Sequence, residues 1–238
     1  MKLSSTLLAS SLLLLAGTAR ICAAPSGEEI GIGIDQTVPA AYPTDMQAHG
    51  ISTGEVRVII SVDAQGVLTD CLVVAYTQES FAREVKSVVK RWKYEPALVH
   101  GNARAASTNL IFKFSSDLTT IVEGLGYGVE AHIMPELKNR YEYSACQLRD
   151  LDHIPTPVHV VQPQLPGLPD TLRTVSVEFY IDEQGKVRAA TIGREYADDI
   201  YAAAAVEAVE KWQFEPPMRR GKAVLVAAKQ DFRFLPKK

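Results

Sequence analysis

An internal repeat is the feature of this sequence that most constrains its fold. Residues 92–96, Trp-Lys-Tyr-Glu-Pro, recur 120 residues later as Trp-Gln-Phe-Glu-Pro at 212–216. The same offset relates Gly101 to Gly221, Ala103 to Ala223, Phe112 to Phe232, and Phe114 to Phe234. Upstream the offset is 119, and it relates Val56, Val58, Asp63, Gln65 and Gly66 to Val175, Val177, Asp182, Gln184 and Gly185. Repetition at a fixed period indicates repeated supersecondary units, so we interpret the chain as a tandem duplication of one small module.

The length of 238 residues suits one or two domains, and the repeat favours two. We expect a first module at 39–116, a linker or inserted segment at 117–157, and a second module at 158–236. A module of this size can fold alone around a thin core. The net charge is −3 and no run of Lys or Arg forms a basic stripe, which argues against nucleic-acid binding.

The first 24 residues are expected to form a signal peptide. A positive start at Met1-Lys2 precedes an apolar stretch at 7–16, and small residues at 22–24 offer a cleavage site. The alternative is an uncleaved membrane anchor. Arg20 argues against the anchor, because a spanning helix needs about 20 apolar residues.

Two cysteines, Cys71 and Cys146, remain if cleavage follows Ala24. An oxidising compartment would permit a disulfide between them. The alternative is that Cys71 is a small buried apolar residue on a strand. Neither cysteine has a neighbour in a Cys-x-x-Cys motif, so zinc binding and redox chemistry are not expected.

The pattern of the first module predicts strand, strand, helix, strand. Apolar residues alternate over 56–62, which is the period of a strand. Residues 63–66, Asp-Ala-Gln-Gly, favour a hairpin turn before a returning strand at 67–76. Apolar residues over 81–92 then follow helical spacing, and alternation at 110–114 predicts the third strand.

The second module repeats this order. A strand is predicted over 175–181, a turn at 182–185, a helix over 201–212 with the same apolar spacing, and a last strand at 224–234. Each module is therefore expected to have a ββαβ core, and the fold class is α+β. The helix must cover one face of the sheet, because its Trp-bearing stripe has to be buried.

The order of these residues resembles the C-terminal domain of the TonB family. The positions that carry the resemblance in the first module are Tyr42, Pro43, Gly50, Gly54, Glu55, Val56, Val58, Asp63, Gly66, Trp92, Tyr94, Pro96, Gly101 and residues 109–114. The second module matches from Val175 through Phe234. The resemblance implies a three-stranded antiparallel sheet with two helices on one face. The second module has ten residues from Leu165 to Val175, against fourteen from Tyr42 to Val56, so its first helix is expected to be short or absent.

Members of this family bind extended segments of outer-membrane transporters, which add as a strand to the sheet edge near the last strand. An open edge leaves unpaired N–H and C=O groups, and an extended peptide can satisfy them. The resemblance therefore implies a periplasmic protein that binds such segments in transmembrane transport of nutrients or siderophores. An alternative is a structural or assembly component of the cell envelope that uses its sheet edges to form a homodimer.

The expected partner-binding residues lie on the two last strands and at the entry to the first module. They are Asn109, Ile111 and Lys113 in the first copy, and Ala227, Lys229, Asp231 and Arg233 in the second. The resemblance adds Tyr42 and Pro43 as a partner contact. For these two residues the alternative is a ring that packs over the sheet beside a proline that fixes the chain direction.

No catalytic or cofactor pattern is found in the sequence. The five histidines lack metal spacing, no Gly-x-Ser-x-Gly is present, and no nucleophile is paired with a base. Asp63 and Asp182 lack the alternating oxygen ligands of a calcium loop and are expected to be turn residues. We therefore expect no enzyme activity, no metal and no cofactor, while a hydrolase or metalloenzyme stays open as a third alternative.

Overall fold

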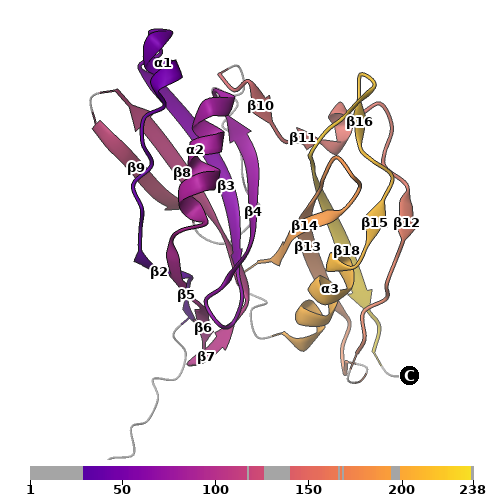
Figure 1. The fold of residues 1–238 in the computed structure, drawn as a ribbon. Helices are drawn as coiled ribbons and strands as arrows, with labels where there is room; N and C mark the ends of the chain where they lie inside the picture. Colours follow the sequence, from indigo (N-terminus) through magenta and orange to yellow (C-terminus); the bar gives the residue numbers. More distant parts are fainter. Residues whose placement is uncertain are drawn as a thin grey trace, which may run out of the picture.

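The structure is a computed structural model that describes residues 29–116, 118–125, 140–165, 167, 169–193 and 199–236. The expected signal peptide at 1–24 lies outside these residues. Figure 1 shows two sheets side by side, each with a helix against one face, so the predicted α+β class is confirmed. The expected three-stranded antiparallel sheets are wrong in strand number, because further strands pair at the edges and make sheets of five and four strands. None of the described helices combines the length and the apolar character that crossing a membrane requires.

The first sheet has five strands in the order β10-β4-β3-β8-β9. Its strands are β3 (Thr53–Val62), β4 (Leu68–Tyr76), β8 (Ala106–Ser115), β9 (Leu118–Leu125) and β10 (Tyr143–Ser144). The helix α2 (Glu79–Val89) packs on one face, and α1 (Thr44–Ala48) precedes β3. Short strands surround this core: β1 (Glu29–Ile30), β2 (Gly33–Gln36), β5 (Lys93–Glu95), β6 (Ala97–Val99) and β7 (Asn102–Arg104).

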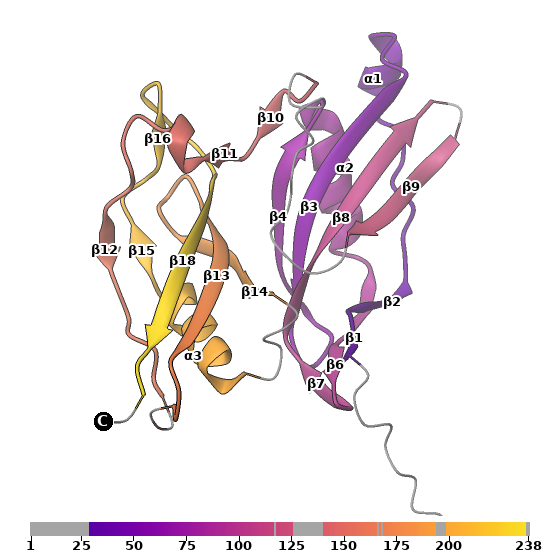
Figure 2. The ribbon, with the colours of Figure 1, turned by 180° about the vertical axis from the view of Figure 1, so that it is seen from behind.

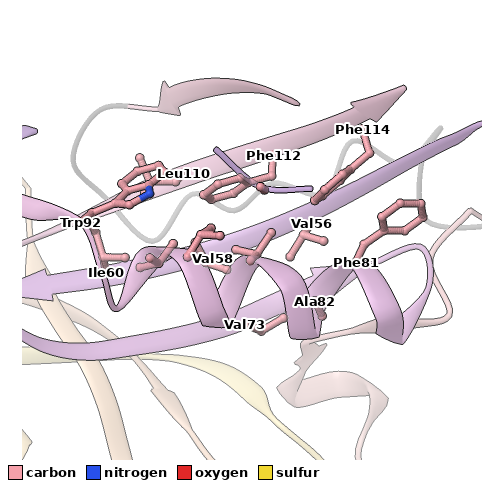
Figure 3. Packing of buried hydrophobic residues seen from close by; sticks show 14 of the residues in the cluster. Val56, Val58, Ile60, Val73, Phe81, Ala82, Trp92, Leu110, Phe112 and Phe114 are labelled. Atoms are coloured by element: carbon pink, nitrogen blue, oxygen red, sulfur yellow. The ribbon is translucent and has the colours of Figure 1, made fainter. Parts of the chain in front are cut away.

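The core of the first sheet follows from the two apolar patterns. Alternate residues of β3 point toward α2, and the apolar stripe of α2 points back, as Figure 3 shows for Val56, Val58 and Phe81. Phe81 and Val56 are fully buried. The predicted stripe is longer than the helix, because Trp92 follows α2 rather than belonging to it. Its ring still packs 5.6 Å from Phe112 of β8.

The second sheet has four strands in the order β11-β18-β13-β14. Its strands are β11 (Cys146–Gln147), β13 (Arg173–Ile181), β14 (Val187–Ile192) and β18 (Val226–Phe234). The helix α3 (Ile200–Glu210) covers one face, and its first turn is capped by Asp199, whose carboxylate accepts from the Tyr201 amide at 2.8 Å. The remaining elements are the 3-10 helix η2 (Leu148–Asp150), β12 (Pro157–His159), β15 (Gln213–Phe214), β16 (Met218–Arg219) and β17 (Lys222–Ala223).

The two sheets share their internal geometry. In the turn after β3, one carboxylate oxygen of Asp63 accepts from the amides of Gln65 and Val67, at 2.9 and 2.8 Å. In the turn after β13, Asp182 accepts from Gln184 and Lys186 in the same way, at 3.1 and 2.8 Å. Among the described residues between β12 and β13 there is no helix, whereas α1 occupies that place before β3.

A short extended segment, residues 143–147, joins the two sheets. Its β10 pairs antiparallel with β4, and its β11 pairs parallel with β18. The Tyr143 hydroxyl donates to Glu183 in the turn of the second sheet, at 3.0 Å. Figure 2 shows this segment crossing between the sheets. Part of the expected linker at 117–157 is therefore paired with the sheets.

The sheet faces opposite the helices also meet. An apolar cluster joins Ile59, Leu72 and Val74 of the first sheet to Tyr180 and Leu225 of the second half of the chain. Beside it, the Arg188 guanidinium donates two hydrogen bonds to Asp70, at 2.5 and 2.9 Å. Its third contact is Asp182, at 3.3 Å. The two halves of the chain, each containing one sheet, thus make contacts that are apolar at the centre and ionic at the side.

The cysteines do not pair, so the disulfide alternative is wrong for this structure. Cys71 and Cys146 are both free thiols. Cys71 packs against the core of the first sheet, and Cys146 belongs to the core of the second. Cys71 is half-buried on β4, close to the alternative of a small buried apolar residue on a strand. Cys146 is buried, and its sulfur accepts from the Arg219 guanidinium at 3.7 Å.

Candidate functional site

The outer edge of β18 is the candidate site in the second sheet. The inner edge of β18 pairs with β13 along its whole length without a register shift, from Val226 to Phe234. The carbonyl of Leu225 accepts from the Cys146 amide of β11, so its backbone groups point to the outer edge. Because backbone direction alternates along a strand, the backbone groups of Ala227, Lys229, Asp231 and Arg233 point outward as well.

Only the beginning of this edge is occupied among the described residues. β11 pairs with Val226 and Ala227 and with no further residue of β18. The Asp231 carbonyl accepts from the side-chain amide of Gln230 at 2.9 Å. The other outward N–H and C=O groups of Lys229, Asp231 and Arg233 have no partner strand among the described residues and are open to a further strand. An unpaired row of this kind is a template for an extended chain.

The side chains on this edge offer different chemistry on the two faces. Lys229, Asp231 and Arg233 are exposed on the face away from α3, where the Ser176 hydroxyl donates to Asp231. On the α3 face, Phe232 is half-buried and its ring lies 5.7 Å from Trp212. A strand added here would meet two cations and one carboxylate on one face and an aromatic surface on the other.

The corresponding edge of the first sheet is not open, which corrects the expectation that both last strands are bare. β9 pairs with β8 and places Leu125, Glu123 and Ile121 opposite Asn109, Ile111 and Lys113. Asn109 and Ile111 are buried, whereas Lys113 is exposed. The outward backbone groups of these three residues face a strand of the same chain.

The positions of Tyr42 and Pro43 are explained by contacts within the first sheet and its helices. The Tyr42 ring lies 5.4 Å from Phe81 and 6.5 Å from Phe114, both edge-on, and its hydroxyl donates to the Ile51 carbonyl. Pro43 caps the N-terminus of α1 in an extended conformation. The structure thus has the packed arrangement, and a partner contact by these two residues stays a prediction.

The strand β9 was not expected from the sequence. Its segment 118–125 has no counterpart after the second repeat, so the internal comparison carries no information about it. The signal that could have found it is the run Thr119 to Val122, which is rich in β-branched residues. The short partner strand β11 has only two residues and gives no such signal.

Metal chemistry has no support in the described part of the chain. No group of three or more His, Cys, Asp or Glu side chains in it is arranged to hold a metal ion. Asp63 and Asp182 use their carboxylates to close turns.

Comparisons with known proteins find similarity to one family. The family model for the C-terminal domain of the Gram-negative bacterial TonB protein matches residues 38–115 and 174–236, more than half of the chain. Protein TonB of Pseudomonas aeruginosa is 33% identical over 78 residues, which are 32% of this chain and 22% of that protein. The chain thus spans about a fifth of the length of this curated relative.

A solved structure is also similar in sequence. The solution NMR structure of the Pseudomonas aeruginosa TonB C-terminal domain is 28% identical, with a TM-score of 0.32. The match covers 37% of this chain and 88% of that one. On the strength of the two segments that match the family model, the chain belongs to the family of the Gram-negative bacterial TonB protein C-terminal domain.

Proposed function

We propose that this protein is a periplasmic TonB-like binding protein, rather than an enzyme, that recognises extended peptide segments of TonB-dependent outer-membrane transporters. The recognition is strand addition to the outer edge of β18, in the service of nutrient or siderophore transport. The observation that supports the proposal is the row of outward N–H groups at Lys229, Asp231 and Arg233, together with the outward carbonyls of Lys229 and Arg233. Membership of the TonB family supports the choice of partner.

The proposal includes a tandem duplication. The modules span 39–116 and 158–236, the segment 117–157 joins them, and a signal peptide at 1–24 directs the chain to the periplasm. Matched contacts support the duplication: the Trp92 indole donates to the Val38 carbonyl at 2.9 Å, and the Trp212 indole donates to the Val161 carbonyl at 2.8 Å. Sequencing the N-terminus of the secreted protein tests the cleavage; a chain that still begins at Met1 contradicts it.

The two copies have different tasks in this proposal. The first copy has its last-strand edge covered by β9 and contributes the interface to the second. The second copy holds the open edge. A partner strand would pair with Asn109, Ile111 and Lys113 only if β9 first separated from β8.

The binding test uses fluorescent peptides that copy the N-terminal segments of such transporters. The change Lys229→Pro removes one outward N–H without removing a bond to β13. We expect it to weaken binding at least about tenfold, the equivalent of about 1.4 kcal/mol. The control Lys229→Gln changes the side chain and keeps the N–H, so it should bind nearly as well as the parent protein. Equal affinity of the proline variant would refute strand addition at this edge.

Self-association through the same edge is the second candidate, and the charges on β18 favour it. If two copies pair antiparallel about Gln230, Lys229 of each copy lies opposite Asp231 of the other. Opposite charges across strands stabilise such a pair by about 0.2–1 kcal/mol each. Analytical ultracentrifugation decides: a concentration-dependent dimer that Lys229→Asp weakens, together with no peptide binding, favours an envelope assembly role.

A further inference from the structure

The edge of a second strand, β14, borders a cleft between the two halves of the chain. β14 is the terminal strand of its sheet, so its outer edge has no partner strand among the described residues. Just before it, Lys186 forms an isolated antiparallel bridge with Gln213. Eight consecutive residues, Lys186 to Gly193, line a cleft of about 740 Å³. Val187 belongs to the core under α3, whereas Arg188 points to Asp70 on the opposite side. A cleft lined by residues from both faces of a terminal strand runs along the edge of that strand.

The cleft has two walls with different chemistry. On one side α3 presents a single stripe, formed by Ala203, Val206, Glu207 and Glu210. On the other side lie Ser61, Arg104 and Ser107, and the two serine hydroxyls are hydrogen-bonded to each other at 2.8 Å. Side chains of a strand point alternately to its two faces. A strand placed in the cleft would therefore direct alternate residues to the α3 wall and to the serine wall.

The dimensions fit an extended peptide. The volume lies within the roughly 300–1,000 Å³ typical of ligand sites, which excludes a folded partner domain. β14 has six residues, and a strand rises about 3.4 Å per residue. The register between β13 and β14 shifts between Arg188 and Thr191, where Ala189 has a positive φ of 50°. A segment of about six residues matches the length of the edge and has to follow this bulge.

The first sheet already accepts an extended segment at the corresponding strand. β4 follows β3 as β14 follows β13, and the outer edge of β4 pairs with β10. The Ala145 amide continues this pairing by donating to the Val74 carbonyl at 2.8 Å. The paired residues of β4 correspond to positions that follow β14, and residues 194–198 lie outside the described residues. Along β14 itself, no described strand pairs with the outer edge.

The charges on the walls select the ligand. Burial and the nearby charge of Glu207 raise the pKa of the Glu210 carboxyl above its ordinary value. Glu207 is paired with Lys211 at 2.7 Å, whereas Glu210 has no ion pair among the described residues. A basic side chain can lay its apolar stem over Val206 and place its charge at Glu210. Arg104, on the opposite wall, favours a hydroxyl or acidic side chain.

We propose that the β14 edge is a second peptide site, which binds an extended segment of a partner protein by strand addition. The segment has basic or apolar residues facing α3, and these alternate with hydroxyl or acidic residues facing Ser61, Arg104 and Ser107. This site is independent of the β18 edge and would remain if that edge bound nothing.

The test uses a blocked heptapeptide, acetyl-Thr-Lys-Thr-Val-Thr-Lys-Thr-amide, titrated into the isotopically labelled mature chain. We expect amide shifts along β14 and α3 that are kept in Lys229→Pro. A peptide with Glu in place of Lys should bind at least about tenfold more weakly, because it meets Glu210. A peptide with alternate N-methylated amides should not bind, because it cannot pair with an edge.

Two protein variants separate the site from a nonspecific effect. Ala203 is exposed on α3, so Ala203→Trp fills the cleft without changing the core and should abolish binding. Glu210→Gln should reduce the preference for Lys over Glu peptides while the fold, followed by circular dichroism, is unchanged. Shifts confined to β18, no shifts at millimolar peptide, or equal binding of the N-methylated peptide would each overturn the proposal.

Discussion

At the scale of single residues, the two hairpin turns show how tightly this fold constrains its glycines. Gly66 and Gly185 both have positive φ, 81° and 80°. Both also lie against the strand that follows the helix: a Cβ on Gly185 would be 1.9 Å from the Phe214 carbonyl oxygen. The Phe214 amide donates to the Gly185 carbonyl at 2.8 Å. Glycine is needed at these turns for two reasons: the backbone has a positive φ, and the neighbouring strand leaves no space for a Cβ.

We predict that Gly185→Ala destabilises the protein by about 3 kcal/mol or more. The left-handed conformation alone costs a non-glycine residue about 1–2 kcal/mol, and the steric contact with Phe214 adds to it. The matched control is Gly221→Ala, because Gly221 has φ 73° but no atom within 4 Å of the added Cβ. Chemical denaturation should show a loss of only about 1–2 kcal/mol for the control. Equal losses of unfolding free energy in the two variants would show that the steric contact with Phe214 does not contribute.

The second residue-scale prediction concerns Cys71. Burial raises the pKa of the Cys71 thiol to about 11, so at pH 8 almost none of it is the reactive thiolate. We expect iodoacetamide to label Cys71 far more slowly in the native protein than in the unfolded one, with the rate rising up to about pH 11. Mass spectrometry of the labelled peptides measures this. Rapid native labelling at pH 8 would contradict the raised pKa of the half-buried Cys71 thiol.

At the scale of elements, the repeat made the main strands and helices predictable. Two independent copies of the same apolar spacing locate α2 and α3, and alternation locates β3, β8 and β13. The elements that could not be predicted are those without a counterpart in the other copy. β9 covers the edge of β8, which it follows directly in the chain, and β11 begins the edge of β18, which lies far along the chain. Neither pairing has a counterpart in the other repeat that could have predicted it. For this reason the sequence predicted where the edges are, but not which of them is covered.

The alternation of backbone direction along β18 gives an element-scale prediction. Gln230 faces β13, so Gln230→Pro removes a bond of the ladder and should cost about 3 kcal/mol. Lys229 faces outward, so Lys229→Pro should cost much less. Thermal unfolding of the two variants measures the difference. The reverse order of stability would place the open groups at even positions and invalidate the assigned edge residues.

At the scale of the whole molecule, the contact between the halves determines which surfaces remain available. Part of each sheet face opposite the helices is buried in the apolar cluster around Tyr180 and Leu225. The ionic contact of Arg188 with Asp70 lies next to this cluster, and the side chains of both are about a quarter exposed, 27% and 26%. Neither partner could be paired from sequence, because they are 118 residues apart and belong to different copies.

We predict that Arg188→Ala destabilises the contact between the halves by about 1–3 kcal/mol, because it leaves Asp70 and the buried Asp182 without their charged donor. Arg188→Lys keeps the charge but not the two parallel bonds, so it should lie between the parent and Arg188→Ala. Thermal unfolding gives the stability, and small-angle scattering should show a broader distribution of shapes for Arg188→Ala. If Arg188→Ala left both stability and shape unchanged, the apolar cluster alone would hold the two sheets together.

The outer edge of β18 is open, whereas that of β8 is covered. Amide hydrogen exchange, measured residue by residue with and without a transporter peptide, tests this difference most directly. In the free protein, the amides of Asn109, Ile111 and Lys113 should exchange slowly, and those of Lys229, Asp231 and Arg233 should exchange fast. Addition of peptide should slow the second set and leave the first unchanged. Protection of Lys229, Asp231 and Arg233 in the free monomer, or no change in them with saturating peptide, would contradict the account.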